Sequence, residues 1–111
     1  EKGFIGNWAP LNKIENSMIA SIKHYCGDEK PIMAGSSIHF DRFFIAAQMP
    51  NLNDHFHYRN FDVSSVKMFY EMFTDEKLKS SNGEPAHEAL KDIQKSIDMT
   101  KEMFTYFAKK T

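Results

Sequence analysis

Apolar residues recur with helical spacing in four segments of the chain. The first segment has steps of three and four between its apolar positions, which are Leu11, Ile14, Met18, Ile22 and Tyr25. Such steps place side chains on one side of an amphipathic helix. The helix should end near Gly27, because glycine accepts the left-handed conformation that closes many helices. Residues 32–35 are short and mainly apolar and follow Pro31, which is typical of a buried strand.

The second helical segment carries a phenylalanine-rich repeat and should end before Pro50. Its repeated apolar positions are Phe40, Phe43, Phe44 and Ala47. Residues 51–58 are polar and loop-like, with room for one helical turn. Residues 59–63 form a second strand candidate. The helix that follows has Ser64 or Ser65 available as its cap. Its expected inward-facing residues are Val66, Phe69, Tyr70 and Phe73.

The carboxy-terminal part of the chain predicts a solvated loop and then a long helix. The loop covers residues 74–84, and the helix should begin near Pro85, since proline is favoured at a first helical position. One helical face carries the apolar stripe of this segment, which runs through Ala86, Leu90, Ile93, Ile97, Thr100, Phe104 and Phe107. We expect this stripe, and the methionines Met33, Met49, Met68, Met72, Met99 and Met103, to fill the core.

Strands that alternate with helices predict an α/β fold on a largely parallel sheet. The 111 residues are enough for one domain, taken as 1–111. However, a sheet of two short strands is too small to be covered by four amphipathic helices. We therefore expect more strands in this fold than the chain supplies.

Composition limits the classes of function. The formal net charge of −1 excludes a strongly basic chain that holds nucleic acid by bulk attraction. The single cysteine, Cys26, cannot form an internal disulfide, so a reducing compartment is expected. No apolar run approaches the ~20 residues that cross a bilayer, and no secretory leader is recognisable.

Two stretches contain residues that could perform metal-assisted chemistry. His87 and Asp92 lie five residues apart at the start of the last helix, a separation that turns a helix by ~140°. The pair does not share a face, so a metal clip within one helix is not expected. Asp41 follows a strand candidate, where open α/β sheets place their sites. The alternative is that all three residues are ordinary surface residues.

A third stretch contains residues that suit phosphate. Arg59 can bind a phosphate with two parallel hydrogen bonds, and its neighbours His57 and Tyr58 can donate to phosphate oxygens. Ser64 could add a hydroxyl at a helix amino end, which attracts anions. The alternative is a loop with ordinary capping serines.

Taken together, "AGSSIHFDRFFIAAQMPNLNDHFHYRNFDVSSVK" and "AHEALKDIQKSI" resemble the second half of oligoribonuclease. This family comprises small DEDDh-type 3′–5′ exoribonucleases with a ribonuclease-H-like α/β fold. The resemblance runs from about Pro31 to the end, and residues 11–25 correspond to the family's preceding helix. It implies an incomplete ribonuclease-H-like exonuclease fold here, with two short strands, four to five helices and no amino-terminal strands.

The resemblance also implies a role for each candidate residue. Asp41 and Asp92 match the third and fourth acidic ligands of a site for two metal ions, Mg²⁺ or Mn²⁺. His87 matches the general base. Ser37 and Ser64 match serines that contact the terminal phosphate of the substrate. The trio His57, Tyr58 and Arg59 matches residues that reach into the neighbouring protomer's site in a homodimer.

The sequence departs from the family in its first acidic motif. No segment resembles the aspartate-x-glutamate pair that supplies the family's first two metal ligands, so the corresponding residues are expected to be missing before Glu1. Phe40 precedes Asp41 where the family often has a polar residue, and Lys91 precedes Asp92 where it usually has an aspartate. Because charge count drives the affinity of carboxylates for hard cations, this chain alone is expected to be nearly inactive.

The implied function is metal-dependent cleavage of very short RNA oligonucleotides or dinucleotides to mononucleotides. The expected partners are this substrate and a second copy of the chain, with no membrane. The expected location is the cytoplasm, with mitochondria as the alternative. The rival hypothesis is an inactive, truncated or diverged module that binds nucleotides or dimerises.

Overall fold

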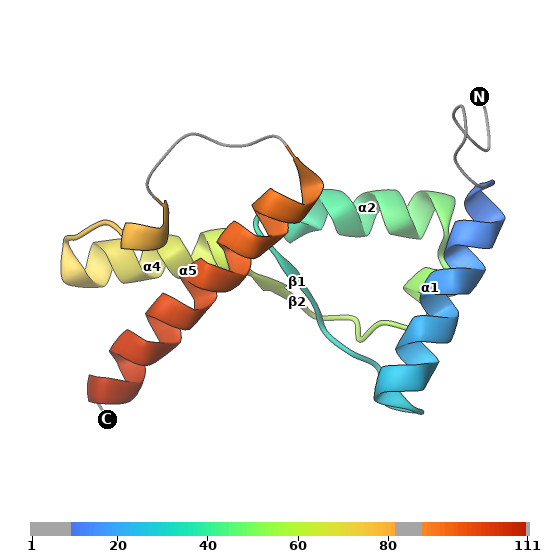
Figure 1. Cartoon of the computed structure of the whole chain (residues 1–111), viewed down its shortest axis with the longest axis horizontal. Helices are drawn as coiled ribbons and strands as arrows, with labels where there is room; N and C mark the ends of the chain where they lie inside the picture. The colour runs from blue at the N-terminus through green and yellow to red at the C-terminus, as the bar shows by residue number, and fades with distance from the viewer. Residues whose placement is uncertain (1–9, 82–87, 111) are drawn as a thin grey trace. The chain divides into compact units, whose positions relative to one another are not determined.

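The computed structural model describes residues 10–81 and 88–110 and has the predicted order of helices and strands (Figure 1). The elements are α1 (Leu11–Cys26), β1 (Met33–Gly35), α2 (Ile38–Gln48), α3 (Pro50–Asn53), β2 (Asn60–Asp62), α4 (Val63–Thr74), the 3₁₀ helix η1 (Lys79–Ser81) and α5 (Ala89–Lys110). Strands β1 and β2 pair in a two-stranded parallel sheet. The predicted start of the last helix near Pro85 lies outside the described residues.

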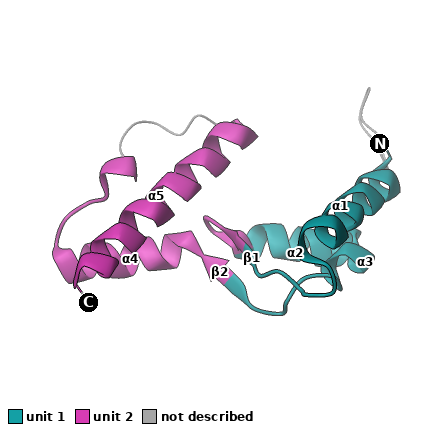
Figure 2. Ribbon diagram, turned by 60° about the horizontal axis from the view of Figure 1, so that its bottom comes forward, with its two compact units in different colours: residues 1–33, 39–60 teal, residues 34–38, 61–111 magenta. Residues whose placement is uncertain are grey.

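The chain divides into two compact units, which Figure 2 shows in teal and magenta. Unit 1 comprises Glu1–Met33 and His39–Asn60, and unit 2 comprises Ala34–Ile38 and Phe61–Thr111. Each unit has its own packing. The assignment of residues 1–111 to one domain remains a prediction.

In unit 1, helix α1 packs against the short helix α3. Gly27 ends α1 as predicted, with a positive φ of 63° and its N–H donating to the carbonyl of Lys23 at 3.0 Å. Leu52 of α3 is fully buried. Its backbone N–H donates to the carboxylate of Glu15 at 2.9 Å, so this buried acid is hydrogen-bonded. The contact fixes the start of the polar loop that leads to β2.

In unit 2, helices α4 and α5 pack together around an apolar core. The buried residues of this core are Val63, Tyr70, Leu78, Met99 and Met103. The Tyr70 ring meets the edge of Tyr106 with a centroid distance of 5.2 Å. Leu78 lies in the segment predicted to be a solvated loop, and that prediction is wrong at this position. Its fully buried side chain holds the segment against α5.

The predicted inward faces of three helices are largely exposed. Phe40, Phe43 and Phe44 of α2, Phe69 and Phe73 of α4, and Leu90, Ile93, Ile97 and Phe104 of α5 are between 43% and 82% exposed. On α5 the buried residues Met99 and Met103 occupy another side of the helix. Helix α5 is therefore apolar on two sides, a pattern that suits a helix covered on both. Met68 and Met72 are likewise exposed rather than core residues.

None of the described helices is long and apolar enough to cross a membrane.

Candidate exonuclease site

Ser37 and Ser64 lie together in unit 2, although 27 residues separate them in the sequence. Ser37 lies in the turn between β1 and α2, and Ser64 lies in the first turn of α4. The N–H of Ser37 donates to the Ser64 hydroxyl at 3.1 Å, and the two hydroxyl oxygens are 3.4 Å apart. The pairing of β1 with β2 explains this proximity, because Ser37 and Ser64 each follow one of the two paired strands.

The cap of helix α4 is Asp62, which corrects the prediction of Ser64 or Ser65. The Asp62 carboxylate accepts the N–H of Ser64 at 3.0 Å, and the Ser65 hydroxyl donates to its other oxygen at 3.3 Å. Aspartate is as good a cap as serine, and here it is the last residue of β2 and has an extended conformation. The Asp62 carboxylate therefore already takes up one backbone N–H of the helix amino end, where an anion was one of the two alternatives.

Asp92 lies in the first turn of α5, where its side chain is exposed. One helical turn further on, the Ser96 hydroxyl meets the Ser36 hydroxyl at 2.7 Å. Because residues four apart share a helix face, Asp92 lies on the side of α5 that meets the turn containing Ser37. Lys91 makes an exposed ion pair with Glu88 at 3.1 Å. Its charge is therefore paired with the Glu88 carboxylate and not with that of its neighbour Asp92.

Asp41 lies in the first turn of α2 in unit 1 and is exposed beside exposed phenylalanines. Its neighbour Arg42 has a separate set of partners. The Arg42 guanidinium donates to Asn53 at 2.8 Å, to the carbonyl of His57 at 2.8 Å and to Asn60 at 3.0 Å. Sequence reasoning missed this role of Arg42. The only signal was a single arginine within a phenylalanine-rich helix that precedes a polar loop.

The trio His57, Tyr58 and Arg59 forms a compact stack on the loop that Arg42 holds. The rings of His57 and Tyr58 stack at 4.6 Å, and the Arg59 guanidinium lies 5.0 Å from the Tyr58 ring centroid. The N–H of Arg59 donates to Nδ1 of His57 at 3.0 Å. Neutral His57 therefore carries its proton on Nε2. Because Tyr58 and Arg59 are exposed, the trio presents donors to the surroundings.

The residues predicted to bind metal are not assembled into a complete site. His87 lies outside the described residues. Asp41 and Asp92 belong to different units, and their convergence stays a prediction. Their carboxylates are hard oxygen donors that suit Mg²⁺ or Mn²⁺. Within residues 10–81 and 88–110, however, no group of three or more histidine, cysteine, aspartate or glutamate side chains could hold a metal ion.

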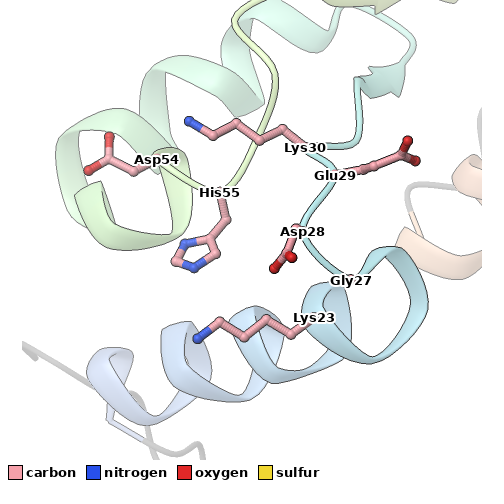
Figure 3. A pocket seen from close by; sticks show the side chains of 7 residues that line it. All are labelled: Lys23, Gly27, Asp28, Glu29, Lys30, Asp54 and His55. Atoms are coloured by element: carbon pink, nitrogen blue, oxygen red, sulfur yellow. The ribbon is translucent and has the colours of Figure 1, made fainter.

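A hollow of about 440 Å³ in unit 1 contains none of the predicted site residues. Its lining is charged and comes from the end of α1, the loop after it and the end of α3: Lys23, Gly27, Asp28, Glu29, Lys30, Asp54 and His55. Figure 3 shows Lys23 and Lys30 on opposite sides of the His55 ring. Acidic and basic groups both line the hollow, so its charge favours no single class of ligand.

Comparison with known proteins places the sequence in a family. The sequence profile of the exonuclease family (RNase_T) matches residues 11–100. That range contains every predicted site residue. It also contains residues 11–25, which we expected to correspond to a helix of the family.

Several curated relatives have the name oligoribonuclease. The chain is 43% identical to the one from Colwellia psychrerythraea over 79 residues, which are 71% of this chain and 44% of the relative. It is 38% identical to the one from Nitrosomonas europaea over 89 residues (80% and 49%), and 42% identical to the one from Shewanella loihica over 91 residues (82% and 50%).

The chain thus spans about half the length of the curated relatives it matches. The predicted fold class, an incomplete ribonuclease-H-like α/β fold, is confirmed by the profile and by the mostly helical structure with its two-stranded parallel sheet. Since the profile covers most of the sequence, the chain belongs to the exonuclease family.

Proposed function

We propose that this chain supplies the carboxy-terminal part of a metal-dependent 3′–5′ exoribonuclease that degrades very short oligonucleotides to mononucleotides. One observation carries the proposal. The exonuclease profile extends over residues 11–100 and includes all the residues whose types suit this chemistry. The names of the relatives, all oligoribonucleases, supply the substrate class.

The metal-binding part of the proposal assigns the Asp41 and Asp92 carboxylates to divalent cations, Mg²⁺ or Mn²⁺. The family's other two acidic ligands, an aspartate-x-glutamate pair, have no counterpart within these 111 residues. Such a bound metal pair supplies an activated water and stabilises the leaving oxygen. His87 acts as the general base that accepts the proton of the water, a task that suits the ordinary pKa range of histidine.

The phosphate-binding part of the proposal explains selectivity for short substrates. The hydroxyl pair of Ser37 and Ser64 binds the terminal phosphate of the substrate. The exposed stack of His57, Tyr58 and Arg59 contributes donors to the site of a second copy in a homodimer. This group stabilises a terminal phosphate only when the substrate is a few nucleotides long, so the protein itself measures the length of the substrate.

The test uses the full-length protein, with any sequence that precedes residue 1 included. Cleavage of a dinucleotide in the presence of Mg²⁺ or Mn²⁺ should fall by roughly 10²-fold or more for His87→Ala, because a general base contributes that much to the rate. The matched control is His24→Ala on the exposed surface of α1, which should retain wild-type turnover. Equal turnover of the two variants would refute the assignment of His87.

The second candidate is a module that binds nucleotides or dimerises without catalysis. The observation in its favour is that the described residues include no complete group of metal ligands. The two candidates differ in what His87→Ala changes. A binding module keeps its affinity for a dinucleotide and shows no metal-dependent turnover before or after the substitution.

A further inference from the structure

The Asp62 carboxylate joins two segments of unit 2 that each carry a predicted phosphate-binding serine. One oxygen, Oδ1, accepts the N–H of Ser37 at 3.0 Å and the N–H of Ser64 at 3.0 Å. The other oxygen, Oδ2, accepts the Ser65 hydroxyl at 3.3 Å. One side chain therefore ties the turn after β1 to the amino end of α4.

The turn that Asp62 holds has an unfavourable backbone conformation. Ser37 has a φ of 53°, in the left-handed region that residues other than glycine, asparagine and aspartate rarely adopt. Such a conformation persists only where the surrounding contacts stabilise it. Here the Ser37 N–H is shared between the Asp62 carboxylate and the Ser64 hydroxyl. The charge-assisted bond to the carboxylate is the stronger of the two kinds.

This arrangement leaves the serine hydroxyls, rather than the backbone N–H groups, for a ligand. The N–H groups of Ser37 and Ser64 are both used by Asp62, so they are not available to a ligand. The Ser64 hydroxyl accepts the Ser37 N–H and also pairs with the Ser37 hydroxyl at 3.4 Å, so one of the two hydroxyl protons lies between the serines and the other can be donated to a ligand. An anion at this place would be bound by the two hydroxyls rather than by the helix amino end.

We infer that Asp62 is a positioning residue for the phosphate-binding pair of Ser37 and Ser64. It acts through the two serines and does not touch the substrate. The inference rests on the proposed function, because that proposal supplies the terminal phosphate. In 3′–5′ degradation the phosphate away from the reacting end is the 5′-phosphate, so the pair should recognise a 5′-phosphorylated dinucleotide.

The test measures the binding of a dinucleotide with and without a 5′-phosphate to the full-length protein, with Ca²⁺ replacing Mg²⁺. The wild type should bind the phosphorylated form about tenfold more tightly, the size expected for hydrogen bonds to a charged group. Asp62→Ala should abolish this preference and leave the affinity for the unphosphorylated form unchanged. Asp62→Asn should retain the preference, because its amide oxygen can still accept both N–H groups.

The control for a merely structural effect is Glu102→Ala in the same unit. Glu102 accepts hydrogen bonds from the backbone of Lys79 and Ser80 and from the Ser80 hydroxyl, none of which involves the serine pair. This variant should keep the preference for the 5′-phosphate. A preference that survives in Asp62→Ala, or that is lost equally in Glu102→Ala, would overturn the inference.

Cleavage and binding separate the two proposals. If the wild type prefers the phosphorylated dinucleotide but cleaves neither form with Mg²⁺ or Mn²⁺, the nuclease proposal fails, and the variants still decide the role of Asp62. If the wild type cleaves dinucleotides without any preference for the 5′-phosphate, the positioning role is wrong and the nuclease proposal stands.

Discussion

In unit 2 one carboxylate accepts hydrogen bonds from several donors, whereas in unit 1 one guanidinium donates hydrogen bonds to several acceptors. Asp62 receives two backbone N–H groups and a hydroxyl, and so holds the turn containing Ser37 against α4. Arg42 donates to a backbone carbonyl and two side-chain amide oxygens, and so holds the loop that carries the trio from His57 to Arg59. Asp62 and Arg42 thus each hold residues that are proposed to bind phosphate, and neither is itself proposed to bind it.

The difference matters because Asp62 and Arg42 leave different kinds of group free to bind a ligand. In unit 2 the backbone N–H groups are consumed, and hydroxyls remain for a ligand. In unit 1 the carbonyl of His57 is consumed, and the side chains of Tyr58 and Arg59 remain exposed. The comparison teaches that the proposed phosphate-binding groups depend on contacts that distant segments of the sequence provide.

The largest effect on stability is expected from Arg42→Ala. This change leaves three acceptors without their shared donor and should destabilise the loop of unit 1 by about 2–3 kcal/mol. Hydrogen exchange should then show faster exchange at amides of this loop, including the N–H of His57 that is bonded to the carbonyl of Pro31. Amides of unit 2 should keep their protection.

Arg59→Ala is the matched control for the loss of an arginine. Arg59 is exposed, and its side chain contacts the Tyr58 ring, so its removal should cost no more than ~0.5–1 kcal/mol. If Arg59→Ala speeds hydrogen exchange in the loop as much as Arg42→Ala does, Arg42 is not the residue that holds the loop in place.

A smaller effect is expected from Asp62→Ala in unit 2. Loss of a helix cap should cost about 1–2 kcal/mol, and faster exchange should appear at the amides of Ser37 and Ser64. Asp75→Asn is the control at the other end of α4. It removes the same charge and keeps a residue that tolerates the left-handed φ of 59° found there. Protection of Ser37 and Ser64 that survives in Asp62→Ala would contradict the assignment.

The smallest effect concerns Glu102 and depends on pH. Burial alone would raise the pKa of the Glu102 carboxyl, but hydrogen bonds from Ser80 and Lys79 hold this pKa below its ordinary value of 4.5. A lowered pKa in the folded state stabilises the protein above the unfolded pKa, and this stabilisation is lost as pH falls through the folded pKa.

Thermal unfolding between pH 7 and pH 3 measures this contribution. The wild type should lose stability more steeply below about pH 4.5 than Glu102→Gln does, and the two should differ most at neutral pH. Parallel curves for the two proteins would show that Glu102 does not gain stability from these hydrogen bonds.

The sequence predicted where helices and strands lie better than which sides they bury. Local periodicity located α1, α2 and α4, because helical spacing depends on neighbours within a few residues. It misassigned the covered side of α5, because this helix carries apolar residues on two sides. Contacts between residues that are far apart in the sequence determine that Met99 is buried while Leu90 is exposed.

The candidate site shows the same limit. The residue types that suit phosphate could be recognised in short stretches, and Ser37 and Ser64 are close in space, while their common role stays a prediction. Asp62 and Arg42 were missed because their functions depend on partners 11 to 25 residues away. In the run from Asp62 to Ser65, three residues could each cap a helix, and spacing alone did not distinguish them.

The most direct test of the central claim compares the 111-residue chain with the full-length protein in a dinucleotide cleavage assay with Mg²⁺ or Mn²⁺. We predict no turnover by the chain alone and metal-dependent turnover by the full-length protein. Robust turnover by the chain alone would contradict the incompleteness of its site. Absence of turnover by the full-length protein would contradict its assignment as a nuclease.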